Sequence, residues 1–276
     1  MCFIQKDNGD IIHDSNAITK EAKLFYENLY ASREDEIVKL DIRNLINIQS
    51  LSLEHSNNLE GLITRQEVLS ALKRVKSDKS PGSDGYTVEF LKFFFVDLGS
   101  FIVRSINCGF RKGEMSVTQR QGVITCIPKE GKDKTLLRNW RPITLLNIVY
   151  KIASSCIAGR LKTVLPQLID VDQKGFFKGR FIGENIRLLY DTLLCASKHH
   201  VPGLLLMVDF EKAFDSVAWS FTEQSLTARN FGQDIKRWIS TFYVYIKSSV
   251  SVNGQYSAWF DVKRGMRQGD PLSLRH

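Results

Sequence analysis

One carboxylate in this chain is placed where metal chemistry could occur. Asp209 directly follows the apolar run Leu204–Val208, which Pro202 and Gly203 precede. A short apolar run bounded by turn residues predicts a buried strand. Because a buried carboxylate without a partner is costly, one at the end of a strand is normally paired, hydrated or bound to a metal. We therefore predict that Asp209 faces a divalent metal. The alternative is that it caps the helix after the strand.

Two basic residues lie on the arms of a predicted hairpin. The β-branched residues 123–127 predict a first strand, and residues 139–145 predict a second one after the loop 130–134. Lys129 and Arg141 would lie on these two arms, where they could hold phosphates. Taken singly, each has a simpler explanation: Lys129 as an exposed side chain, and Arg141 as the partner of a carboxylate.

Two glycine-containing segments could approach a nucleic-acid strand closely. Residues 79–86, KSPGSDGY, form a turn-rich loop whose backbone carries few bulky side chains. Residues 173–180, QKGFFKGR, combine basic and aromatic side chains with glycine, as single-strand binding requires. Each segment alone is a weak signal.

Several elements that must position these residues can be predicted. Thr64 and Glu67 have the spacing of a helix-capping box. Asn253-Gly254, between alternating apolar residues, predicts a tight hairpin. Residues 1–62 contain a helical repeat of apolar positions but no motif that indicates chemistry.

Composition favours a folded protein with a local polyanion-binding surface. The 276 residues carry a net charge of +8, and residues 111–180 hold 14 Lys and Arg against five Asp and Glu. Such a stretch indicates a nucleic-acid partner, or simply a hydrated basic face. The five scattered cysteines form no C-x-x-C pair, which argues against structural zinc and predicts an intracellular location. No apolar run is long enough for a membrane helix, so we expect no membrane partner.

Five sequence blocks together resemble the reverse transcriptase of non-LTR (LINE-like) retrotransposons. They occur in the order of that family: KSPGSDGYTVEF (79–90), IPKEGKDKTLLRNWRPITLLN (127–147), QKGFFKGRFIGENI (173–186), VDFEKAFDSV (208–217) and RGMRQGDPLS (264–273). The resemblance covers roughly residues 60–276. It implies an α+β fold with the fingers and a partial palm of a right-hand polymerase, and without the thumb. The expected organisation is an N-terminal helical extension or linker (1–62), a fingers-like region (63–200) and a partial palm (201–276).

The resemblance also implies a role for each site residue. Asp209 is similar to the first catalytic aspartate and metal ligand, and the Phe210 carbonyl to the neighbouring ligand. Phe214 is similar to the residue under the incoming sugar that rejects a 2′-hydroxyl. Nucleotide contacts are implied for Lys129, Arg141, Phe214, Gln268 and Gly269. Template or primer contacts are implied for Lys79, Pro81, Gly82, Asp84, Gly85, Lys174, Gly175, Phe176 and Arg180. Asp215 is expected to cap the helix near Ala218, or to pair with a base, more than to bind metal.

The implied chemistry is nucleotidyl transfer with two Mg²⁺ ions about 4 Å apart. The partners would be an RNA template, a DNA primer and deoxynucleoside triphosphates. In the family, the other aspartates lie in an aromatic-x-Asp-Asp hairpin downstream, and this sequence contains no Asp-Asp pair. We therefore expect a truncated copy that is inactive alone, with an open palm edge through which it self-associates.

Three other interpretations remain open from the sequence. The chain could be a nucleic-acid-binding module without catalysis, with residues 111–180 as its basic surface, or a relic of a retroelement. It could also copy RNA into RNA, although Phe214 favours deoxynucleotides.

Overall fold

The fold combines helices with a five-stranded sheet, as the α+β expectation requires. The computed structural model describes residues 1–6, 8–32, 48–175, 177 and 179–273. Its helices are α1 (Ser15–Leu29), α2 (Leu53–Asn57), α3 (Arg65–Arg74), α4 (Val88–Phe93), α5 (Phe95–Lys112), α6 (Val117–Arg120), α7 (Ile148–Leu168), α8 (Gly183–Lys198), α9 (Ala213–Ser216), α10 (Trp219–Ala228) and α11 (Gln233–Tyr243). Its strands are β1 (Ile4–Gln5), β2 (Ile11–Ile12), β3 (Gln121–Pro128), β4 (Trp140–Leu146), β5 (Lys247–Val252), β6 (Gln255–Tyr256) and β7 (Phe260–Asp261).

Strand β3 lies inside the sheet, between β4 and β5. It runs antiparallel to β4, with Ile127 opposite Arg141, so the predicted hairpin with two basic arms is confirmed. It runs parallel to β5, which is more than a hundred residues away in sequence. Strands β6 and β7 both pair with β5. The second predicted hairpin is also confirmed, because Asn253 and Gly254 link β5 to β6 with φ values of 51° and 80°.

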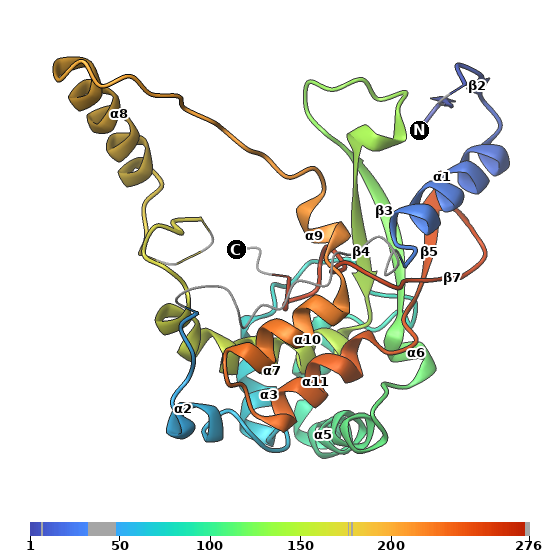
Figure 1. The fold of residues 1–276 in the computed structure, drawn as a ribbon. Coiled ribbons are helices and arrows are strands. Elements are labelled where there is room, and N and C mark those ends of the chain that lie inside the picture. The colour runs from blue at the N-terminus through green and yellow to red at the C-terminus, as the bar shows by residue number, and fades with distance from the viewer. Residues whose placement is uncertain (7, 33–47, 176, 178, 274–276) are drawn as a thin grey trace.

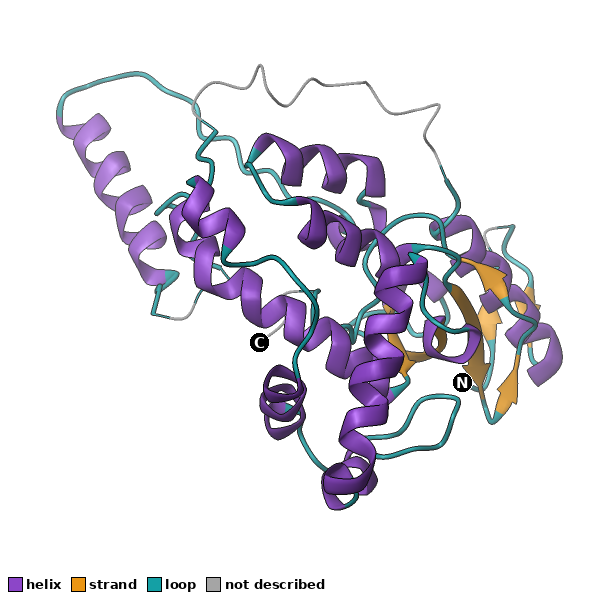
Figure 2. Ribbon diagram, turned by 90° about the horizontal axis from the view of Figure 1, so that it is seen from below, coloured by secondary structure: helices purple, strands orange, loops and turns teal. Residues whose placement is uncertain are grey.

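Most helices lie to one side of the strands, as Figure 2 shows. There α3, α5, α7 and α11 bury a common apolar core. The predicted capping box is present at the start of α3, where the Thr64 side chain accepts from the Glu67 backbone and Glu67 accepts in return. No helix in the described ranges is long and apolar enough to span a bilayer.

A second core joins α1 to the sheet (Figure 1). Ile18, Ala22, Tyr26 and Tyr30 recur every four residues, and at most 1% of each is exposed. They pack with Ile124 of β3 and with residues of β5 and β7. Helix α1 is therefore part of the packed fold, and its last turn points toward the segment 213–217.

The predicted buried strand at Leu204–Asp209 is wrong. Residues 201–210 have no regular secondary structure, and every one of them is exposed, with Leu204 at 90%. In Figure 1 this segment is the long connection from α8 to α9. No strand of the described residues lies beside it, and a strand gains its stability from hydrogen bonds to a neighbour.

Candidate functional site

Asp215 is buried, whereas Asp209 is exposed. Only 4% of Asp215 is accessible. The Tyr30 hydroxyl donates to its Oδ1 at 3.1 Å, and Gln268 Nε2 donates to Oδ1 at 3.3 Å and to Oδ2 at 3.1 Å. The prediction that Asp215 caps the helix near Ala218 is wrong, because α10 begins there without a side-chain capping bond. Asp215 instead joins three separate segments of the chain.

The loop 264–270 is fixed between α9 and β4. The Met266 N–H donates to the Phe214 carbonyl at 2.8 Å, and the Thr144 N–H donates to the Gln268 carbonyl at 2.7 Å. Phe214 is half-buried and Gly269 is exposed. The structure thus brings Phe214, Gln268 and Gly269 together, as the resemblance implies.

A buried guanidinium lies in the same loop. Arg267 is 1% exposed, donates from Nη1 to the Arg120 carbonyl at 2.9 Å and lies 4.5 Å from the centre of the Tyr150 ring. The Tyr150 hydroxyl donates to Asp270 Oδ2 at 2.9 Å. Burial, and then the charge of Asp270, hold the pKa of Tyr150 well above its usual value, so this phenol remains a donor.

The basic arms of the β3–β4 hairpin differ in their surroundings. Arg141 is exposed, whereas Lys129 is half-buried and donates from Nζ to the Arg138 carbonyl at 3.2 Å. Sequence reasoning missed a third cation, Lys212, which has a φ of 52° and lies 4.5 Å from the Phe25 ring. Burial lowers the pKa of Lys212, and the charge of Lys129 lowers it further, while Glu211 and Asp215 oppose this. Lys129 and Lys212 therefore influence one another electrostatically.

The loop 79–85 is fastened to the start of α7. Asn147 Oδ1 accepts from Ser83 Oγ and from the Asp84 N–H, both at 3.3 Å. A Cβ on Gly82 would lie 2.0 Å from that oxygen, so only glycine fits there. Burial raises the pKa of Asp84. Lys79 and Gly85 are exposed and Pro81 is half-buried, which leaves this loop with an accessible edge.

The segment 173–180 lies apart from the other blocks, next to α8 (Figure 1). Lys174 forms an ion pair with Glu184. Arg180 donates to the Gln173 carbonyl at 2.8 Å and covers the Phe177 ring at 4.5 Å. Gly175 is half-buried, and Phe176 lies outside the described residues. The template contacts expected of this segment stay a prediction, and two of its cations already have partners within the protein.

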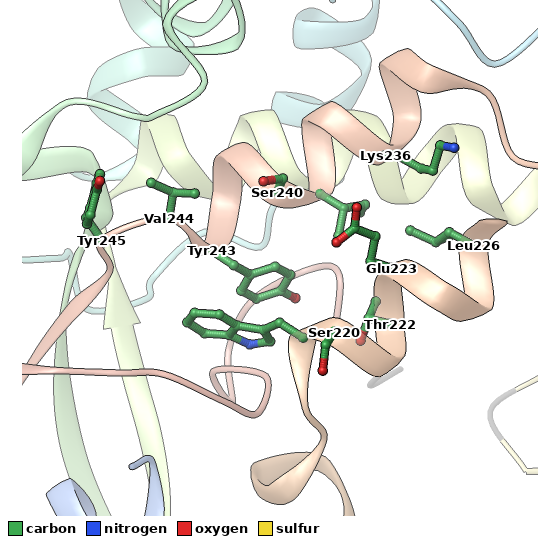
Figure 3. Close-up of a pocket in the computed structure, with 11 residues that line it drawn as sticks. Ser220, Thr222, Glu223, Leu226, Lys236, Ser240, Tyr243, Val244 and Tyr245 are labelled. Atoms are coloured by element: carbon green, nitrogen blue, oxygen red, sulfur yellow. The ribbon is translucent and has the colours of Figure 1, made fainter. Parts of the chain in front are cut away.

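A pocket of about 420 Å³ lies between α10 and α11 (Figure 3). Trp219 and Tyr243 stack in its wall with ring centres 5.3 Å apart, and Trp219 Nε1 donates to the Gly265 carbonyl at 2.9 Å. None of the predicted site residues lines this pocket. Trp219 thus links the wall of this pocket to the loop 264–270, and the pocket is distinct from the cluster around Asp215.

Comparison with known proteins identifies a family that covers four of the five sequence blocks. Residues 127–274 match the family described as "Reverse transcriptase (RNA-dependent DNA polymerase)". The chain belongs to the reverse transcriptase family.

Relatives of this reverse transcriptase chain come from non-LTR retrotransposons. It is 36% identical over 273 residues to the "Transposon TX1 uncharacterized 149 kDa protein" of Xenopus laevis, covering 99% of this chain and 21% of that protein. It is 27% identical over 215 residues to the Pol polyprotein of the R2 element of Popillia japonica, covering 76% of this chain and 29% of the relative. It is 24% identical over 212 residues to the "RNA-directed DNA polymerase from mobile element jockey" of Drosophila melanogaster, covering 76% and 23%. The chain therefore spans less than a third of the length of these curated relatives.

Reverse transcriptases generally use Mg²⁺, and the described residues of this one do not assemble a site for it. No group of three or more potential ligand side chains occurs among them. Asp209 and the Phe210 carbonyl lie on an exposed irregular segment, and the oxygens of Asp215 already accept hydrogen bonds. One carboxylate does not satisfy a cation that prefers six oxygen ligands, so these residues alone do not fit the ion.

Sequence reasoning missed Tyr30 in this reverse transcriptase. The signal was present: Ile18, Ala22 and Tyr26 mark a buried face of α1, and Tyr30 continues it by four residues. A tyrosine on such a face needs a hydrogen-bond partner for its hydroxyl. The sequence could not say which partner, because Asp215 is 185 residues away.

Proposed function

We propose that this chain forms the nucleotide- and template-binding part of an RNA-directed DNA polymerase. The observation that carries the proposal is that Phe214, Asp215 and Gln268 come from two family blocks and meet in one cluster, in which Asp215 and Gln268 are buried. In this proposal Phe214 lies under the incoming sugar, and Gln268 and Gly269 contact the nucleotide and the template base. Residues 63–200 act as fingers and residues 201–276 as part of the palm.

The basic side chains give the proposal a polyanion partner. Arg141 is exposed on β4, Lys212 is the N-cap residue of α9, and Lys129 is close enough to lower the pKa of Lys212. We assign them to the phosphates of nucleotide and primer–template, with the loop 79–85 tracking the template. Mg²⁺, held by Asp209 in a larger ligand set, would supply the activation of the primer hydroxyl when bound.

Primer extension on an RNA template tests the catalytic part. We expect no extension by the 276-residue chain, and extension by a chain continued at its C-terminus with an aromatic-x-Asp-Asp hairpin. Phe214→Ala in the extending chain should admit ribonucleotides, whereas wild type should prefer deoxynucleotides. Failure of every continued chain would contradict the assignment of Asp209, and equal use of both sugars by wild type would contradict that of Phe214.

The exposed position of Asp209 favours a second function, nucleic-acid binding without catalysis. Fluorescence anisotropy with an RNA–DNA hybrid at several salt concentrations measures the phosphate contacts. Arg141→Ala should reduce the slope of log K against log salt by about 1. Arg104→Ala, an exposed change on α5, is the matched control and should leave the slope unchanged. Binding with no extension by any continued chain would support this second function.

We also propose that the chain self-associates through residues 204–208. These apolar side chains are exposed together and lie on an irregular backbone with free polar groups among the described atoms. An exposed apolar run of this kind is prone to pair with another copy.

A further inference from the structure

The end of α1 is fixed directly to the residues that precede the Gln268 loop. The Tyr30 carbonyl accepts from the Lys263 N–H at 2.9 Å, and the Leu29 carbonyl accepts from Arg264 Nε at 2.8 Å. Tyr30 is the C-terminal cap of α1 and is 1% exposed. Its place therefore depends on the same loop whose glutamine reaches Asp215.

The Tyr30 hydroxyl and the Gln268 amide share one carboxylate. Oδ1 of Asp215 accepts from both, at 3.1 Å and 3.3 Å, and Oδ2 accepts from Gln268 at 3.1 Å. All three side chains are more than nine-tenths buried. A carboxylate accepts hydrogen bonds from several directions, so each donor limits the rotation that the other bonds allow.

Tyr30 can act on this carboxylate only as a donor. Burial raises its pKa well above the usual value, and the negative charge of Asp215 raises it further. The phenol therefore keeps its proton at neutral pH.

The Gln268 side chain is held by hydrogen bonds from its amide nitrogen, Nε2. Nε2 faces the Asp215 carboxylate, which fixes the orientation of the amide because a carboxylate only accepts. Oε1 is buried, and no partner for it exists among the described atoms. The orientation of this amide therefore depends on its hydrogen bonds to the Asp215 carboxylate.

We propose that Tyr30 is a positioning residue of the nucleotide site: by holding Asp215, it fixes the Gln268 side chain, and with it the loop 264–270 to which the proposed function assigns the nucleotide contacts. The proposal rests on the proposed function for the nucleotide contact, and on the hydrogen bonds alone for the positioning. It gives the N-terminal segment a role in the site that its sequence does not indicate.

Two tyrosines on the same face of α1 allow a matched test. Tyr30→Phe removes only the hydroxyl that contacts Asp215. Tyr26→Phe removes the hydroxyl one turn earlier, which contacts Cys126 Sγ at 3.5 Å, and it serves as the control. Both side chains are buried. Because phenylalanine keeps the aromatic ring, both variants still fill the core.

The first measurement is the side-chain amide signal of Gln268 in glutamine-labelled protein, assigned by its disappearance in Gln268→Glu. The second is the dissociation constant for the next deoxynucleotide on the chain carrying an RNA template and a dideoxy-terminated primer with Mg²⁺, which requires no chemistry. Tyr30→Phe should shift or broaden the Gln268 signal and weaken nucleotide binding roughly tenfold, the effect of losing one hydrogen bond to a charged group. Tyr26→Phe should change neither.

An unchanged Gln268 signal in Tyr30→Phe would overturn the proposal, as would equal changes in both variants, which would indicate helix packing alone. If wild type binds no nucleotide, the proposed function fails at that step. The Gln268 signal then still decides whether Tyr30 positions the pair, so the two failures are distinguishable.

Discussion

At the scale of single residues, two glycines allow the backbone of the loop 264–270 to lie directly against α9 and β4. Gly265 has a φ of 77°, and a Cβ there would lie 2.3 Å from the Asp215 carbonyl oxygen. Gly269 has a φ of 113°, and a Cβ there would lie 2.7 Å from the Thr144 carbonyl oxygen. Each position combines a left-handed conformation with a close approach, so no other residue fits either one without displacing α9 or β4.

Gly265→Ala should destabilise the protein by about 2–5 kcal/mol, since left-handed strain adds to overpacking against Asp215. Gly131→Ala is the control: its φ is 68°, but the space around it is open. That variant should lose about 1–2 kcal/mol, from the strain alone. Urea denaturation measures both, and equal losses would show that the contact with Asp215 relaxes freely.

Residue-scale prediction succeeded where a residue type has one dominant use. The capping box at Thr64 and the turn at Asn253-Gly254 are encoded within four residues, and both are present. The helix cap expected of Asp215 is absent, and its hydrogen-bond partners are 185 and 53 residues distant. Local patterns carry no information on such contacts.

At the scale of elements, an ion pair joins α3 to α7 beside the apolar core that they share. Arg160 of α7 donates from Nε and Nη2 to the Glu67 carboxylate at 2.7 Å and 3.0 Å. Arg160 Nη1 also donates to the Leu59 and Gly61 carbonyls, both at 2.9 Å. This guanidinium therefore fixes the turn before α3 as well as the helix itself.

The ion pair between Glu67 and Arg160 makes the free energy of unfolding depend on pH. Burial raises the pKa of Glu67, but the hydrogen bonds from Arg160 and Thr64 outweigh burial and leave it below its usual value of 4.5. A lowered pKa contributes stability that is complete above the unfolded value and is lost as pH falls through the folded one. The free energy of unfolding of wild type should thus fall as the pH is lowered below about 5, and Glu67→Gln should show a smaller fall. The free energies are measured by urea denaturation at each pH. The same pH dependence in wild type and in Glu67→Gln would show that Glu67 does not cause the loss of stability.

Element prediction failed at residues 204–209 for a physical reason. A helix satisfies its hydrogen bonds internally, so α3 and α7 could be expected from their own sequence. A strand needs a neighbour, and the described residues place none beside this segment. An apolar run shows only that burial would be favourable, and the partner that would bury it must come from elsewhere.

At the scale of the whole molecule, one long stretch of the chain leaves many apolar side chains exposed. Helix α8 has no buried residue, although Ile186, Leu188 and Leu194 are apolar, and the following segment 204–208 is equally exposed. Figure 1 shows both standing away from the sheet. The rest of the described fold buries two cores, so this region contributes little to folding and much to the apolar surface.

Leu204→Gln combined with Leu206→Gln should leave the free energy of unfolding within about 0.5 kcal/mol of wild type, because these side chains are exposed. As the protein concentration rises, the mass of wild type measured by light scattering should increase, whereas the mass of the double variant should stay near that of the monomer. Phe93→Gln, at a site that is 79% exposed on α4, is the control and should not change association. An unaltered mass in the double variant would contradict self-association through this segment.

The parallel pairing of β3 with β5 has a consequence for synthesis. Strand β3 ends at Pro128 and β5 begins at Lys247, and the face of α1 packs on β5 and β7. At ribosomal rates of about 5–20 residues per second, β5 is synthesised roughly ten seconds after β3, and the interval between α1 and β5 is longer. During that interval β5 and β7 cannot cover the apolar face of α1. We therefore expect this face to be exposed on the nascent chain, where chaperones bind apolar segments.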